Sequence, residues 1–164
     1  MAELQRLRPD HADAVLAFER ENRAYFAATM PDRGDDYYEH FAARHDSLLA
    51  EQDAGVCAFH VLVGDDGEVV GRFNLVDIED GGAELGYRVA QKSSGRGVAT
   101  AAVRELCRLA SGEYGLRTLR AVTRRTNVAS QKVLTRTGFV EVGETVLSGL
   151  PGIQYLRRFE HGQP

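Results

Sequence analysis

A glycine-rich loop in the second half of the chain carries the clearest chemical signal. Gly95 and Gly97 flank Arg96, directly before a run with helical apolar spacing that starts at Val98. Glycines let consecutive backbone amides converge in one concavity, and the start of a helix adds positive potential there. Such a nest of amides binds phosphate oxygens. The loop therefore predicts a phosphate-binding site, with a ligand-free connection as the structural alternative.

Two other phosphate-binding motifs do not fit the same residues. A P-loop requires Lys followed by Ser or Thr after the second glycine, where this chain has Val98 and Ala99. A Rossmann fingerprint would place a small residue where Thr100 stands and would belong to a larger parallel sheet. An NADP site that uses Arg124 and Arg125 for the 2′-phosphate is therefore disfavoured.

The loop is predicted to connect a strand at 83–89 to a helix at 98–111, followed by a strand at 116–123. The other predicted elements are a strand ending at Pro9, a helix from Asp10, a helix from 35 or 36 to about 49, a hairpin of 59–63 and 69–78, a helix from 126 or 127 to 137, and strands at 139–146 and 153–159. This order predicts an α/β fold with a mostly antiparallel sheet and one parallel crossover.

Length and composition indicate one globular domain spanning residues 1–164. The 43% hydrophobic and 27% charged residues supply enough apolar surface for a core without the bias of a disordered or coiled-coil chain. A chain of 164 residues is close to the size of one ordinary domain.

The motifs resemble the GNAT superfamily of acyl-CoA-dependent N-acyltransferases. The segment Ser94-Gly-Arg-Gly-Val-Ala99 is similar to its Gln/Arg-x-x-Gly-x-Gly/Ala pyrophosphate loop, with Ser94 at the place of the usual Gln or Arg. Glu84-Leu-Gly-Tyr87 and the run from Asn127 to Leu134 resemble the branch that contains the ribosomal-protein alanine N-acetyltransferases. Thr135 follows Leu134, so the tyrosine acid that some relatives carry near the end of this helix is missing.

This resemblance implies a GNAT-like, splayed sheet flanked by helices, with the cofactor between the strands at 83–89 and 116–123. The pantetheine arm would pair with backbone near Tyr87 and Val89, and the pyrophosphate would rest on the amides after Ser94. The implied cofactor-binding residues are Tyr87, Val89, Ser94, Gly95, Arg96, Gly97, Val98, Ala99, Thr100, Asn127 and Ser130.

The resemblance also frames the catalytic roles. Glu84, the carboxylate of the central strand, is predicted to take the amine proton through a water molecule. The alternative is that Glu84 is a solvated strand residue or a partner of Arg88. Ser130 is predicted to donate a proton to the departing sulfur, or else to bond locally to backbone. Asn127 would order the turn, also as a helix cap. An amide near Val89 would stabilise the carbonyl oxygen, and the amine would attack the thioester directly.

The charge is divided unevenly along the chain. Residues 1–82 carry a net charge of −11, and residues 83–164 carry +7. The acidic half suits a cationic acceptor, and the basic half suits a small polyanion. A basic cluster without interleaved aromatic residues fits a nucleotide 3′-phosphate or a solvated face better than extended nucleic acid: Arg117, Arg120, Arg124, Arg125, Lys132 and Arg136.

The remaining reactive residue types point to no further chemistry. Cys57 and Cys107 are predicted to be free thiols, with Cys107 in the core. No metal is predicted, because the five histidines show no ligand spacing: His11, His40, His45, His60 and His161. No apolar run reaches the roughly 20 residues of a membrane helix, and Met1–Arg6 has no signal-peptide pattern, so a cytoplasmic protein is expected.

Together these features predict an enzyme that transfers an acetyl group from acetyl-CoA to a primary amine. The favoured acceptor is a protein or peptide N-terminus. A small-molecule amine is the first alternative, and a non-catalytic acyl-CoA-binding sensor is the second. Segments 20–40 and 145–153 are expected to determine the acceptor.

Overall fold

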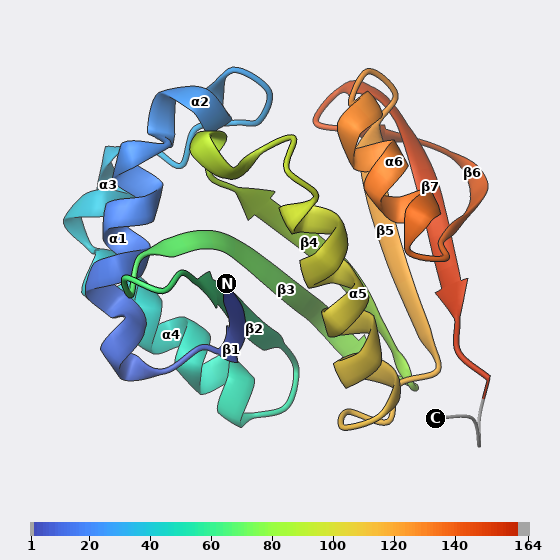
Figure 1. Cartoon of the computed structure of the whole chain (residues 1–164), viewed down its shortest axis with the longest axis horizontal. Coiled ribbons are helices and arrows are strands. Elements are labelled where there is room, and N and C mark those ends of the chain that lie inside the picture. Colours follow the sequence, from blue (N-terminus) through green and yellow to red (C-terminus); the bar gives the residue numbers. More distant parts are fainter. Residues whose placement is uncertain (1, 161–164) are drawn as a thin grey trace.

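The computed structural model describes residues 2–160, so His161 lies outside the described part (Figure 1). Its elements, in chain order, are β1 (Glu3–Arg6), η1 (Pro9–His11), α1 (Ala12–Glu21), α2 (Arg23–Ala27), α3 (Asp35–Glu39), α4 (Phe41–Asp53), β2 (Ala58–Val63), β3 (Val69–Glu79), β4 (Gly82–Val89), η2 (Gln91–Ser93), α5 (Val98–Ser111), β5 (Thr118–Arg124), α6 (Val128–Arg136), β6 (Val140–Leu147) and β7 (Leu150–Arg158).

Seven strands form one mixed sheet in the order β1-β2-β3-β4-β5-β7-β6. Every neighbouring pair is antiparallel except β4 and β5, which are parallel and connected through α5. The predicted fold class and the single parallel crossover are therefore confirmed. A parallel pair needs a long connection, and the β4-α5-β5 unit supplies it.

The sheet opens between β4 and β5. Their register pairs only Gly82–Glu84 with Thr118–Arg120, although β4 continues to Val89 and β5 to Arg124. Figure 1 shows the two strands diverging, with α5 and α6 on either side of the gap. Backbone N–H and C=O groups must find partners when they are buried. The unpaired edge of β4 after Glu84 therefore offers such groups to a ligand.

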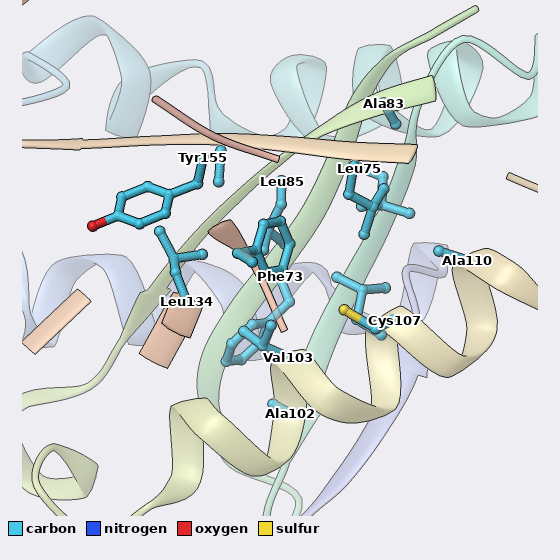
Figure 2. Close-up of a cluster of buried hydrophobic side chains, with 14 of the residues drawn as sticks. Phe73, Leu75, Ala83, Leu85, Ala102, Val103, Cys107, Ala110, Leu134 and Tyr155 are labelled. Atoms are coloured by element: carbon cyan, nitrogen blue, oxygen red, sulfur yellow. The ribbon is translucent and has the colours of Figure 1, made fainter. Parts of the chain in front are cut away.

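Two apolar cores hold the sheet between helices. On one face, α5 buries Val103, Leu106 and Cys107 against side chains that include Phe73 and Leu85 (Figure 2). On the other face, residues of α1 to α4, such as Phe18 and Phe41, pack against Phe59 and other strand residues. Strand residues alternate between these faces, so β4 presents Ala83 and Leu85 to α5 and Glu84 to the opposite side.

The helices differ from the prediction in two ways. The helix expected from residue 35 or 36 to about 49 is divided into α3 and α4 at His40, whose φ of −110° and ψ of 28° are not helical. No Gly or Pro marks this point, so the periodicity carries no sign of the break. The short helix α2 was not predicted; it forms where Phe26 packs against Phe18, with ring centroids 5.5 Å apart.

None of the helices within residues 2–160 combines the length and the apolar character needed to cross a membrane.

Candidate active site

A cleft of about 390 Å³ lies where β4 and β5 separate. Its walls come from α2 and the residues after it, the end of β4, the glycine loop, the start of α5, and α6. The lining residues are Tyr25, Phe26, Thr29, Met30, Tyr87, Arg88, Val89, Ser93, Ser94, Gly95, Gly97, Val98, Ala99, Thr100, Asn127, Ala129, Ser130, Lys132, Val133 and Arg136.

The glycine loop has the backbone conformation that a phosphate nest requires. Gly95 and Gly97 both have φ of +74°, in the left-handed region that favours glycine. Gly97 is the N-cap of α5, and no side chain caps the helix there. The first N–H groups of a helix lack intrahelical acceptors, so these donors can bind an anion at the positive end of the helix dipole. The residues present thus fit the pyrophosphate of an acyl-CoA.

Basic side chains are distributed unevenly around the glycine loop. Lys132 and Arg136 of α6 line the cleft, whereas Arg96 is exposed and is not among the lining residues. The predicted basic cluster is divided, because Arg117 lies beside Gly81 at the other end of the sheet and Arg125 forms an ion pair with Glu144. Only part of the cluster is therefore positioned to meet a nucleotide phosphate.

Tyr87, Asn127 and Ser130 form a connected group on the cleft wall. The Tyr87 hydroxyl donates to Ser130 Oγ at 3.2 Å, and the Ser130 backbone N–H donates to Asn127 Oδ1 at 3.1 Å. Asn127 thus caps α6, as predicted for it as a helix cap. The Tyr87 ring stacks on Phe73 with centroids 5.4 Å apart. Burial raises the pKa of Tyr87 above its usual value, although the hydrogen bond to Ser130 opposes this, so the hydroxyl stays protonated at neutral pH.

Glu84 lies on the opposite face of β4 from Tyr87 and is half-buried. It pairs in register with Val76 on β3 and with Arg120 on β5, at the last paired position before the two parallel strands separate. It is not among the residues that line the cleft. The ion pair recorded for Arg88 is with Glu19. Glu84 therefore stands at the base of the opening without the arginine partner considered for it.

Several lining residues were not predicted individually. Tyr25, Phe26, Thr29 and Met30 come from the segment 20–40, which was expected to determine the acceptor, but no position in 145–153 lines the cleft. The aromatic residues and the methionine in segment 20–40 were the sequence signal that could have indicated these lining residues. Asn74 was also missed. It lies opposite Gly86 in the strand register, and within the described chain its buried Oδ1 has no hydrogen-bond donor.

The cysteines and histidines lie away from this chemistry. Both cysteines are free, and burial raises the pKa of each thiol, which disfavours the reactive thiolate. Among residues 2–160, Asp36, Glu39 and His40 bring potential ligand atoms within 4.8 Å of one another. These residues lie three and four positions apart in α3 and at its C-terminal cap, so they share one side of the helix. All three residues are exposed, and exposed acidic groups are common without an ion.

Comparison with known proteins identifies the family of the chain. Residues 2–140 match the family described as "Acetyltransferase (GNAT) domain". The chain belongs to the GNAT acetyltransferase family.

Individual relatives are similar over most of their length. The probable N-acetyltransferase YjcK of Bacillus subtilis is 26% identical over 141 residues, covering 80% of this chain and 76% of that protein. The crystal structure of a ribosomal-protein-S5-alanine acetyltransferase from Vibrio fischeri has a TM-score of 0.92 and 19% identity, covering 99% of this chain and 96% of the other. A spermidine N-acetyltransferase chimera from Vibrio cholerae has a TM-score of 0.80 and 14% identity, covering 96% and 95%.

These findings confirm the predicted enzyme class. The chain is an acyl-CoA-dependent N-acetyltransferase, with acetyl-CoA as its cosubstrate, because the family assignment agrees with the nest of amides at the start of α5. The named N-acetyltransferase relatives favour an enzyme over a non-catalytic acyl-CoA sensor.

Proposed function

We propose that this acetyltransferase modifies the N-terminal amine of a protein or peptide. The observation that carries the proposal is an empty space beside Gly86 on the sheet, referred to below as the open place at Gly86. Gly86 is exposed, and a Cβ built there would meet no heavy atom within 4 Å. It lies on the same face of β4 as Glu84, just beyond the point where β4 leaves β5. A flexible chain end can reach this position from solvent.

Groups around Gly86 can receive an amine. Glu84 is two residues before it on β4, and Asn74 is its partner on β3. The Oδ1 of Asn74 is buried without a donor among residues 2–160, and Asn74 lines a second, smaller pocket next to Arg33 and Arg72. The similarity in fold to a ribosomal-protein-S5-alanine acetyltransferase supports the same class of acceptor.

Transfer requires two proton movements, for which the chain offers separate groups. Acetyl-CoA supplies the acetyl group as a thioester; the amine nitrogen forms the new C–N bond while the C–S bond breaks. Glu84 accepts the proton that the amine loses, through a water molecule. Ser130 donates a proton to the leaving sulfur and recovers it from the Tyr87 hydroxyl, which already donates to Ser130 Oγ. Tyr87 then regains a proton from solvent before the next turnover, because burial disfavours its deprotonated form. No covalent enzyme intermediate is required.

The cofactor-binding assignment follows the same geometry. The backbone amides between Ser94 and Thr100 bind the pyrophosphate, and the unpaired edge of β4 near Tyr87 and Val89 binds the pantetheine arm. Lys132 adds positive charge for the nucleotide phosphates from α6. Arg96, which is exposed outside the lining, contributes through its backbone.

Purified protein should be incubated with acetyl-CoA and hexapeptides that begin with different residues, with free thiol release as the rate measurement. Mass spectrometry should locate the acetyl group on the N-terminal nitrogen. Matched peptides with a blocked N-terminus and an internal lysine are the control and should not react. Turnover of spermidine and other small amines without turnover of any free N-terminus would contradict the proposal.

A further inference from the structure

Four charged side chains from distant parts of the sequence meet beside the open face of β4. The carboxylate of Glu19 on α1 lies 2.7 Å from Arg72, 3.0 Å from Arg33 and 3.1 Å from Arg88. The Glu19 side chain is 1% exposed, and those of Arg72, Arg88 and Arg33 are 6%, 17% and 28% exposed. Three guanidinium groups thus share one buried carboxylate, which leaves two positive charges in excess.

The groups around this cluster do not remove the excess. Tyr37 accepts a hydrogen bond from Arg72 at 3.1 Å, while Arg44 brings another cation to the Tyr37 ring. Asp32 and Asp35, the nearest acidic residues in sequence to Arg33, bond to Arg23 instead. Unpaired buried charge is costly, so such an excess favours a site that receives an anion.

Arg88 is the least satisfied of the three arginines. Arg33 makes two hydrogen bonds to Glu19, whose charge raises the pKa of Arg33 even though burial opposes this. Arg88 makes one, and burial and repulsion by Arg33 lower the pKa of Arg88 despite Glu19. Its other contacts are with uncharged groups: the Met30 sulfur at 3.8 Å and the Phe26 ring at 4.6 Å.

Arg88 also lies where an acceptor would be held. It lines the cleft together with Phe26 and Met30. On β4 it follows Glu84 and Gly86 on the same face, with the open place at Gly86 between them. Residues two apart in a strand are separated by roughly 6.6 Å, close to the reach from a terminal amine to the side-chain carboxylate of the second residue.

We propose that the acceptor carries a carboxylate close to its reacting amine and that Arg88 binds this carboxylate. In a peptide acceptor, the carboxylate belongs to Asp or Glu at the second position; in a free amino acid, it is the acceptor's own. This inference rests on the proposed function and narrows its substrate class. It also adds an anionic group to the cationic acceptor that the acidic half of the chain suggested, because the acidic character of residues 1–82 does not extend to this face.

The test compares three hexapeptides that differ only at the second residue, which is Glu, Gln or Lys. We expect kcat/KM for the Glu peptide to exceed that for the Gln peptide on the order of 10-fold, the size of one hydrogen bond to a charged group. The Lys peptide and spermidine should be poorer than the Gln peptide. In R88M, the preference for Glu over Gln should fall close to one. R108M, which removes an exposed arginine paired with Glu105 on α5, should keep the wild-type preference.

The outcomes separate the two proposals. Equal rates for the three peptides with wild-type protein, or an unchanged preference in a folded R88M, would overturn the carboxylate inference and leave N-terminal acetylation intact. Turnover of free glutamate with no turnover of any peptide would support the carboxylate site and overturn the N-terminal assignment. The wild-type comparison does not depend on the stability of R88M, and R88K, which keeps the charge, should retain part of the preference.

Discussion

At the scale of single residues, the proposed acid and the proposed base lie on opposite faces of β4. Tyr87 faces α5 and reaches Ser130, while Glu84 lies on the opposite face beside the open place at Gly86. An acid for the sulfur and a base for the amine can thus approach one reaction centre from different sides without neutralising each other. This separation allows the two roles to be tested independently.

Glu84→Gln should lower kcat/KM on the order of 10²-fold at neutral pH, because general-base catalysis typically contributes at least that much. The loss should shrink as the pH rises above about 8, where an α-amino group is already deprotonated in solution. Initial rates from pH 6.5 to 10 and calorimetric acetyl-CoA affinities would measure both effects, with the exposed Glu79→Gln as control. A uniform reduction at every pH would assign Glu84 a structural role.

Tyr87→Phe and Ser130→Ala should each lower kcat by roughly 10² at saturating acetyl-CoA, because each breaks the same proton relay. The double variant should be no slower than the slower single variant, since groups that act as one unit are not additive. The measurement is kcat of the wild type, the two single variants and the double variant at one fixed pH, which together form a double-mutant cycle. Losses that simply multiply would show that the two hydroxyl groups act separately.

At the scale of elements, the loop between η2 and α5 is the proposed site for the pyrophosphate of acetyl-CoA. Gly97→Val should abolish acetyl-CoA binding, because a β-branched residue at φ of +74° forces the backbone amides out of the nest. The strain should also reduce stability by about 1–3 kcal/mol.

Gly55→Val is the matched control for that strain. Gly55 follows α4, has φ of +80° and open space around it, but lies outside the cleft. It should lose similar stability in urea titrations and keep wild-type calorimetric affinity for acetyl-CoA. Full affinity in a folded Gly97→Val protein would show that the loop is only a connection.

At the scale of the whole molecule, the side chain of His60 on β2 bonds to β3 and to the segment that follows α5. Its Nδ1 lies 3.1 Å from the Phe73 carbonyl oxygen, which can only accept, so Nε2 accepts from the Tyr114 hydroxyl at 2.6 Å. Burial lowers the pKa of His60 from 6.5 to about 4. The neutral ring is therefore part of the folded structure.

This lowered pKa predicts acid sensitivity with a definite sign. Between pH 6.5 and about 4 the unfolded chain binds a proton at His60 that the folded chain excludes, so stability falls as the pH falls through this window. The full loss is about 3 kcal/mol. Urea titrations at pH 7 and 5 should show a smaller decrease in His60→Asn than in wild type, whereas the exposed His40→Asn should match wild type. Equal decreases in all three proteins would remove His60 as the cause.

The sequence alone determined the elements whose signals are local. Helix α5 spans 98–111 as predicted, because apolar periodicity, the glycine at its N-cap and Gly112 at its C-cap coincide. The hairpin of β2 and β3, the cap at Asn127 and the nest at Gly95 and Gly97 are likewise short-range features. These features, with the resemblance they carry, were sufficient for the fold class and for acetyl-CoA.

Only the tertiary structure showed which residues distant in sequence lie next to one another. The register that ends β4–β5 pairing at Glu84 depends on contacts across the sheet, and so do the open place at Gly86 and the Tyr87–Ser130 bond. Glu19, Arg33, Arg72 and Arg88 are separated by up to 69 positions and converge because α1 and the segment after α2 pack on the face of β3 and β4. Charge counted along the chain indicated an acidic half, whereas folding gathers three arginines around Glu19 beside β4, since proximity in space and not in sequence sets the local field.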